Sequence, residues 1–133
     1  MGAWGSGPFE NDDASDWVWD LEDETDATVI IAALSAAVDT PTDEQVDAPT
    51  ASNAIAAAEV LASAHGPRSP DLPTEAVEWL RVNHAIVDER LRALAFGAVQ
   101  RISVDSELKE LWDDARDDTW AESVRVLAER LRR

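Results

Sequence analysis

The sequence predicts an all-α fold: an irregular bundle of six to seven helices preceded by a Gly-rich N-terminal arm. Apolar residues recur every three or four positions in several segments, which is the spacing of one face of a helix. Proline, glycine and polar residues separate these segments. The best candidate for a strand, TVII at residues 28–31, is short and continues into alanines. With 133 residues and a hydrophobic share of 45%, the chain is expected to form one helical domain over residues 1–133.

Residues 1–10 form the predicted N-terminal arm, which contains three glycines and the aromatic residues Trp4 and Phe9. Aromatic side chains have much apolar surface to bury, so the favoured interpretation is a tethered tail whose aromatic residues fill part of the core. The alternative is a glycine loop that presents backbone N–H groups to an anion. The arm lacks the lysine and the Ser/Thr ending of a phosphate-binding loop and follows no strand, which weakens this alternative.

The first helix is predicted to begin after Asn11, whose side chain suits the N-cap position. Asp12, Asp16 and Asp20 recur four residues apart along one of its faces. Like charges at this spacing repel each other, and no basic residue lies nearby in sequence to relieve the repulsion. Trp19 lies off the apolar face and is expected to be exposed. The apolar face itself consists of Ala14, Trp17, Val18 and Leu21.

The following region is predicted to contain two helices joined by an acidic loop. The first of these helices begins near Asp26, and its residues expected to face inward are Val29, Ile30, Ala33, Leu34 and Ala37. Residues 39–50 are assigned to the acidic loop because they are polar and two prolines interrupt them. The next helix, at about residues 51–65, is mostly alanine, and Glu59 is its only charged residue.

Four further helices complete the predicted bundle. The first follows the rigid sequence RSPDLP, and the second covers about residues 86–102. Asp105 or Ser106 is expected to cap a short helix after them. Thr119 and Glu122 are expected to form a capping box at the start of the last helix. Because the helix at 86–102 and the last helix have the longest apolar faces, they are expected to be the main supports of the core.

The net charge of −17 is distributed unevenly along the chain. Residues 1–67 contain 14 Asp and Glu and no Lys or Arg, whereas residues 68–133 contain 14 acidic and 11 basic residues. This argues against nucleic-acid binding, which depends on Lys and Arg that neutralise phosphates. Three interpretations of the acidity stay open: solvation in a saline, halophile-like cytoplasm, a surface for a basic protein partner, or a cation site.

The remaining composition favours a cytoplasmic protein. Cysteine is absent, which excludes disulfides and thiolate metal sites and suits a reducing compartment. No segment approaches the roughly 18 consecutive apolar residues of a membrane span. The N-terminus lacks the basic and apolar regions of a secretory signal. We therefore expect no membrane association.

Four segments of the chain resemble, in the same order, those of a small prokaryotic domain-of-unknown-function family. They are WGSGPFENDDASDW (4–17), AIAAAEVLASAHG (54–66), DLP (71–73) and DSELKELWDD (105–114). Members of this family open with the pattern W-G-x-G-x-F-x-N-D-x-A-x-D. The resemblance covers nearly the whole chain and implies a stand-alone cytoplasmic protein. It implies no activity, substrate or catalytic residue.

The leading hypothesis is a non-enzymatic interaction module whose acidic N-terminal half binds a basic protein surface. An immunity or antitoxin-like role is one form that this hypothesis takes. No catalytic residue, metal ligand or cofactor is assigned, because the two histidines do not form a metal-binding pair and no nucleophile motif occurs. The candidate residues for binding a ligand or partner are Trp4, Asn11, Asp12, Asp16, Trp19 and Glu59.

The alternative hypothesis is an enzyme or a divalent-cation-binding protein. Asp12, Asp16 and Glu59 would supply its carboxylates beside the Gly-rich arm. Glu59 is the central residue of this hypothesis, because burial in an alanine-rich helix would raise its pKa. The competing interpretation is that Glu59 faces water or accepts a hydrogen bond from the arm.

Overall fold

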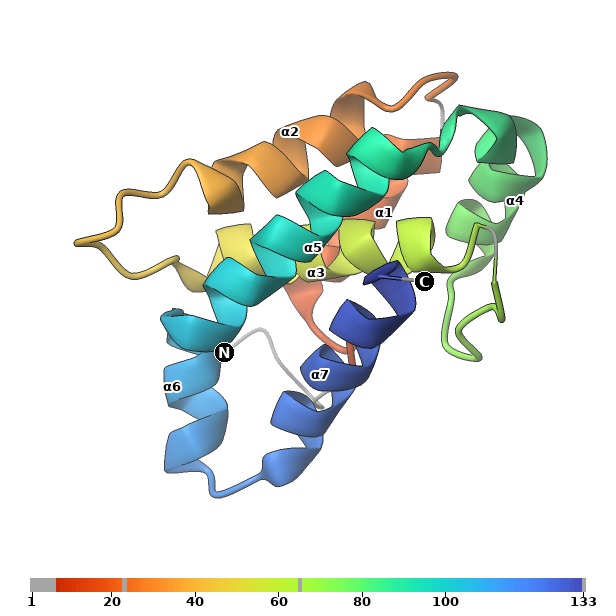
Figure 1. Cartoon of the computed structure of the whole chain (residues 1–133). Helices are drawn as coiled ribbons and strands as arrows, with labels where there is room; N and C mark the ends of the chain where they lie inside the picture. The colour runs from red at the N-terminus through yellow and green to blue at the C-terminus, as the bar shows by residue number, and fades with distance from the viewer. Residues whose placement is uncertain (1–6, 23, 65, 133) are drawn as a thin grey trace.

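The computed structural model describes residues 7–22, 24–64 and 66–132. Over these residues the protein is an all-α bundle of seven α-helices and one 3-10 helix (Figure 1), which confirms the predicted fold class. None of the helices in this described part is long and apolar enough to cross a membrane. The helices are α1 (Asp12–Glu22), α2 (Thr28–Val38), α3 (Ala48–Ala62), α4 (Thr74–Asn83), η1 (His84–Ile86), α5 (Glu89–Val104), α6 (Glu107–Asp114) and α7 (Asp118–Arg132).

The alanine-rich helix α3 occupies the centre of the bundle and contacts α1, α2, α5, α6 and α7. Eleven of its 15 residues are buried, and six of these are alanines. Small side chains let neighbouring helices approach closely on every side. The helices expected to support the core, α5 and α7, do pack against each other. The helix that the others surround is nevertheless α3.

The start of α3 differs from the prediction. Pro49 was expected to interrupt the chain within a loop, but it lies in the first turn of α3. Proline is well tolerated there because its missing N–H would have no partner within the helix. Asp47 caps the helix by accepting a hydrogen bond from the Thr50 N–H at 2.8 Å. The acidic loop is therefore shorter than the predicted 39–50 and ends at Asp47.

The acidic loop is attached to the junction between α5 and α6. Val46 is completely buried and forms an isolated parallel bridge with Ser106. Arg101 of α5 donates hydrogen bonds to the backbone carbonyls of Pro41 and Glu44, at 3.0 and 2.5 Å. The loop visible at the left of Figure 1 is thus held at both ends. Sequence patterns did not indicate this attachment, because Val46 is a single apolar residue in a polar segment.

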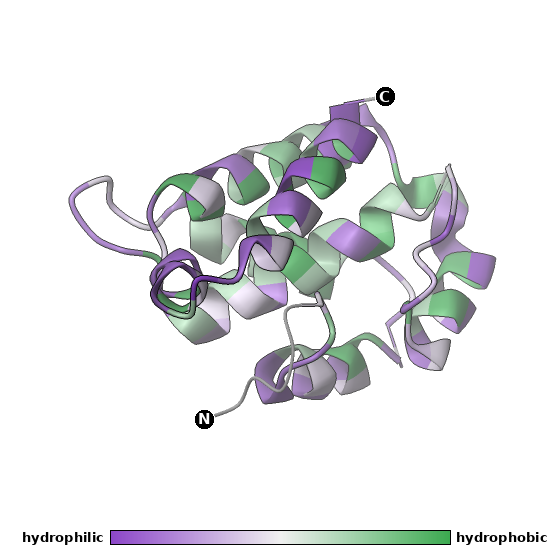
Figure 2. Ribbon diagram, turned by 90° about the horizontal axis from the view of Figure 1, so that it is seen from below, coloured by the Kyte–Doolittle hydropathy of each residue, from purple (hydrophilic) through white to green (hydrophobic). Residues whose placement is uncertain are grey.

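The outer helices also contact one another around α3. Helices α2 and α5 pack on each other and on α3, whereas α1 packs on α3 and α4. Figure 2 shows hydrophilic residues along the projecting acidic loop, and hydrophilic and hydrophobic residues in turn along several of the helices. Helices α1 and α7 each bury their apolar face, as predicted.

The connection between α6 and α7 also refines the prediction. Ser106 caps α6 by accepting a hydrogen bond from the Lys109 N–H at 3.0 Å, which selects one of the two expected caps. The expected capping box of the last helix is not formed. Helix α7 begins at Asp118, before Thr119, whose N–H donates to the Asp117 carboxylate at 2.9 Å. The Glu122 side chain pairs instead with Arg125 one turn later.

Candidate interaction surface

Helix α1 is oriented by its cap and by its buried face. The Asn11 side chain accepts a hydrogen bond from the Ala14 N–H at 2.8 Å, so Asn11 is the predicted N-cap. Burial of the apolar face turns the opposite face of the helix toward solvent. That opposite face carries three carboxylates and one indole. We call these residues the acidic α1 face: Asp12, Asp16, Trp19 and Asp20, all of which are exposed.

Within the described part of the chain, Trp19 is the largest apolar side chain that is more than half exposed. It is 64% exposed, whereas Trp17 on the buried side of the same helix is 6% exposed. Exposure of an indole leaves a large apolar area in water. Tryptophan is among the residues that contribute most to binding energy at protein interfaces. The exposure of Trp19 was predicted from the helical spacing alone.

Among the described residues, no cation pairs with the carboxylates of the acidic α1 face. Residues 1–67 contain no Lys or Arg, and no ion pair involves Asp12, Asp16 or Asp20 in the part of the chain that is described. Uncompensated charges of one sign create a potential that attracts an oppositely charged surface. The face therefore combines an exposed indole with negative charge on both sides of it along the helix.

Glu59 is located differently from the other candidate residues. It is only 4% exposed, and its carboxylate accepts a hydrogen bond from Arg130 of α7 within an ion pair. Arg130 also donates to the Ser63 hydroxyl at 3.3 Å and to the Pro67 carbonyl at 2.9 Å. These contacts neutralise the carboxylate and connect α3, α7 and the segment after α3. Sequence reasoning left the burial of Glu59 open. The competing interpretation, in which Glu59 faces water, is wrong, and the partner Arg130 was not foreseen.

The structure does not gather the candidate carboxylates into a metal site. Among residues 7–22, 24–64 and 66–132, no group of three or more His, Asp or Glu residues could hold a metal ion. Asp12 and Asp16 lie on the exposed side of α1, whereas Glu59 is engaged by Arg130. Trp4 lies outside the described residues.

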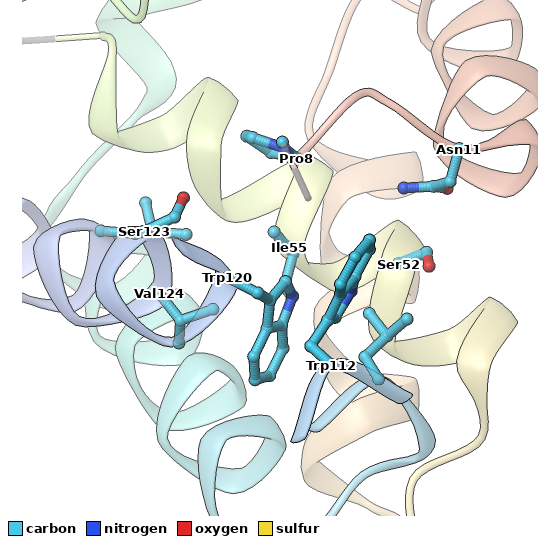
Figure 3. A pocket seen from close by; sticks show the side chains of 11 residues that line it. Pro8, Asn11, Ser52, Ile55, Trp112, Trp120, Ser123 and Val124 are labelled. Atoms are coloured by element: carbon cyan, nitrogen blue, oxygen red, sulfur yellow. The ribbon is translucent and has the colours of Figure 1, made fainter. Parts of the chain in front are cut away.

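A small pocket lies where the N-terminal segment meets α3, α6 and α7. Figure 3 shows Ile55 of α3 together with the indoles of Trp112 and Trp120, with Pro8 and Asn11 at the edge. Its volume is about 20 Å³, enough for one water molecule. The Gly7 N–H, part of the glycine loop considered for anion binding, donates to the Glu10 carboxylate at 3.0 Å. The pocket is thus a packing junction between three helices.

Three of the four segments that carry the family resemblance meet at this junction. Residues 4–17 contribute Gly7, Pro8 and Asn11, residues 54–66 contribute Ile55, and residues 105–114 contribute Leu108 and Trp112. Comparison with known proteins agrees with the resemblance. A family model described as a domain of unknown function (DUF4259) matches residues 2–123. No curated protein and no solved structure matches the chain.

Proposed function

The chain belongs to the DUF4259 family, whose description assigns no function, and on this premise we propose that it is a non-enzymatic protein-interaction module. The acidic α1 face binds a basic surface of another protein. The observation that carries this proposal is the 64% exposure of Trp19 on a helix face whose three carboxylates have no basic residue near them in sequence.

The chemistry of the face suits arginine and lysine side chains. A guanidinium or ammonium group can stack on the face of an indole and be attracted by its π electrons. The same group can pair with the carboxylate of Asp16, one turn before Trp19, or with that of Asp20, the residue after it. Arginine suits such a site best because its planar group both stacks and hydrogen-bonds. A positively charged partner would also be steered toward the negative half of the protein.

The proposal places the protein in the cytoplasm with a basic protein as its partner. An immunity or antitoxin-like role is one form of it, because such proteins act by covering a surface of another protein. An enzyme or divalent-cation protein is the weaker alternative. Its central carboxylate, Glu59, is already paired with Arg130, so no observation favours that alternative.

The test is capture of partners from native lysate at low salt, with the protein as bait and two matched variants. One variant removes three charges from the acidic α1 face: Asp12→Asn, Asp16→Asn and Asp20→Asn. The control removes three exposed charges elsewhere: Asp71→Asn, Asp114→Asn and Asp118→Asn. A basic protein retained by the wild type and the control, but lost with the α1 variant and with Trp19→Ala, supports the proposal. Equal retention by all baits contradicts it.

Salt dependence provides the second criterion of this test. Attraction between exposed charges weakens over a Debye length of about 8 Å at physiological ionic strength. The captured protein should therefore elute steeply as salt increases. A partner that stays bound at high salt, and whose binding Trp19→Ala does not weaken, would contradict binding through the acidic α1 face.

A further inference from the structure

Helix α2 has an apolar outer surface that no described part of the protein covers. Its sequence, TVIIAALSAAV, contains no charged residue, although 29% of the whole chain is charged. Ile30, Leu34 and Ala37 are buried, while Ile31 and Val38 on the outer side are 41% and 40% exposed. Apart from Thr28 and Ser35 the helix is apolar all round, and such a helix is normally buried on all sides. One side of α2 therefore lacks the cover that its composition suits.

The neighbouring helix α5 extends this apolar surface. Helices α2 and α5 both pack on α3 and on each other (Figure 1), so their exposed sides lie away from α3. Val104 of α5 is 71% exposed. Gly97 and Ala93 are exposed on the same side of the helix, about two and three turns before Val104, and the polar residue Gln100 is exposed between Gly97 and Val104. We define the α2–α5 face by its exposed apolar residues and glycine, among which the polar residues Thr28 and Gln100 are also exposed: Ile31, Ala32, Ala36, Val38, Ala93, Gly97 and Val104.

Gly97 has no role in the packing of the bundle itself. A Cβ atom at this position would meet no other atom within 4 Å, so alanine would fit. Glycine in the middle of a helix weakens the helix relative to alanine. Because Gly97 has no side chain, the exposed surface of α5 is recessed at this position, which would allow another backbone to approach closely.

The charges at the two ends of the α2–α5 face indicate what kind of segment covers it. Because Arg101 near the end of α5 binds the chain just after α2, the two helices run in the same direction. Both ends of the face carry carboxylates. Glu24, Asp26, Asp88 and Glu89 surround the starts of the helices, together with Arg90, and Asp39, Asp43, Glu44 and Asp105 follow their ends.

A second copy of this chain fits the face poorly. Either orientation of a second α2–α5 face would place acidic ends against acidic ends, and each copy carries a net charge of −17. Like charges placed opposite each other disfavour association. A segment with basic ends has the complementary charge.

We propose that the α2–α5 face is a docking site for an amphipathic helix of a partner protein, with an apolar side and Lys or Arg at both ends. An amphipathic helix lays its apolar side on such a surface, and its terminal charges fix its register. The inference rests on the proposed function in that the partner is basic. The inference goes beyond the proposed function in three respects. It assigns a second contact surface, and it specifies that the bound segment is a helix with its positive charges at both ends.

The proposal is tested by NMR titration of the ¹⁵N-labelled protein with three synthetic 18-residue peptides. The first is an amphipathic helix with leucine and alanine on one side and lysine at both ends. The second has glutamate at both ends, and the third has the composition of the first in an order without helical periodicity. We expect the first peptide to shift the amide signals of the α2–α5 face and to bind at least tenfold more tightly than the other two.

Matched protein variants localise the contact. Ala36→Glu places a charge in the α2–α5 face, and Ala121→Glu makes the same change at an exposed position of α7. Exposed alanine-to-glutamate changes within helices have little effect on folding, which the spectra themselves verify. Ala36→Glu should weaken binding of the first peptide at least tenfold, and Ala121→Glu should leave it unchanged. Equal effects of the two variants would overturn the proposal.

The Trp19 indole N–H signal separates this inference from the proposed function. If the unordered basic peptide shifts Trp19 and no peptide shifts the α2–α5 face, the proposed docking site is wrong while the role of the acidic α1 face stands. If the helical peptide shifts only the α2–α5 face, that site stands and the role of Trp19 does not. Sedimentation of the free protein completes the test. A dimer that Ala36→Glu dissociates would identify a second copy as the occupant and overturn the proposal.

Discussion

Glu59 of α3 and Arg130 of α7 form a buried ion pair between residues 71 positions apart in the sequence. Their side chains are 6% and 18% exposed. Removal of one partner from a buried pair leaves a charge without compensation, which costs about 3–5 kcal/mol. We therefore expect Glu59→Ala to lower the free energy of unfolding by that amount, as measured by urea denaturation.

Replacement of both partners tests whether the pair acts through its charges. The double variant Glu59→Leu with Arg130→Met should recover most of the lost stability, because an apolar pair of similar volume needs no compensation. Glu122→Gln, which affects an exposed ion pair with Arg125, should change stability little. If Glu59→Ala were as mild as Glu122→Gln, the pair would not stabilise the fold.

Arg101 holds the acidic loop against α5. It donates to the carbonyls of Pro41, Glu44 and Asp105, and hydrogen bonds from a charged donor contribute about 1.5–3 kcal/mol each at most. Arg101→Met should lower stability by about 1–3 kcal/mol and speed hydrogen exchange at Val46, whose N–H bonds to the Asp105 carbonyl. Gln100→Met, an exposed neighbour, should do neither. Unchanged exchange at Val46 in the Arg101 variant would show that the loop is held by other contacts.

Arg116 adopts a left-handed backbone conformation with φ 56°. It follows α6, where the N–H of Asp117 bonds to the Trp112 carbonyl and that of Arg116 bonds to the Asp113 carbonyl. This hydrogen-bond pattern usually has glycine at the left-handed position. Arg116→Gly should raise the free energy of unfolding by about 1 kcal/mol, whereas Ala115→Gly, with φ −75°, should lower it by about 0.5–1 kcal/mol. If Arg116→Gly were less stable than Ala115→Gly, the left-handed conformation would not be a source of strain at Arg116.

Asp26 should respond to pH through its contact with Thr28. Its pKa is lowered from 3.8 chiefly because the Thr28 backbone N–H donates to its carboxylate. A lowered pKa in the folded state means that the contact stabilises the protein above the unfolded pKa and is lost as the pH falls through the folded one. NMR titration should give a midpoint below 3.8, and Asp26→Asn should remove the corresponding pH dependence of stability. A midpoint above 3.8 would contradict the hydrogen bond.

The salt dependence of folding separates a binding role for the acidic surface from an adaptation to salt. We expect circular dichroism to show a folded protein at low KCl, with a melting temperature that rises and then levels off as the unpaired carboxylates are screened. A protein that is unfolded at low salt and gains stability up to molar KCl would favour solvation in a saline cytoplasm. The case for a basic partner would then lose its main support.

Some local features of the fold were predictable from the sequence, although the start of α3 and the capping of α7 were not. Distant contacts were not predictable. The N-cap at Asn11 and the exposure of Trp19 follow from spacing within a single helix. The partner of Glu59 lies 71 positions away, and no periodicity connects the two residues. The buried position of Val46 depends on its bridge to Ser106, which is equally invisible in sequence.

The uncovered side of α2 illustrates a different limit. Ile30, Leu34 and Ala37 were expected to face inward and are buried. Ile31, Ala32 and Ala36 are equally apolar, so the sequence did not show that the opposite side would be left uncovered. Amphipathic helices such as α1 do show this contrast, which is why the acidic α1 face could be predicted and the α2–α5 face could not. A helix that is apolar throughout reveals its open side only in three dimensions.

The central position of α3 has a consequence for how this protein can change during evolution. Ala51, Ala54, Ala56, Ala57 and Ala58 are completely buried, and each added methyl group there would push apart helices already in contact. Amino-acid substitutions are therefore expected to accumulate slowly in α3 and faster in the exposed acidic loop. Distant descendants of a common ancestor should share the alanines of the centre long after their surfaces, and the partners that those surfaces select, have diverged.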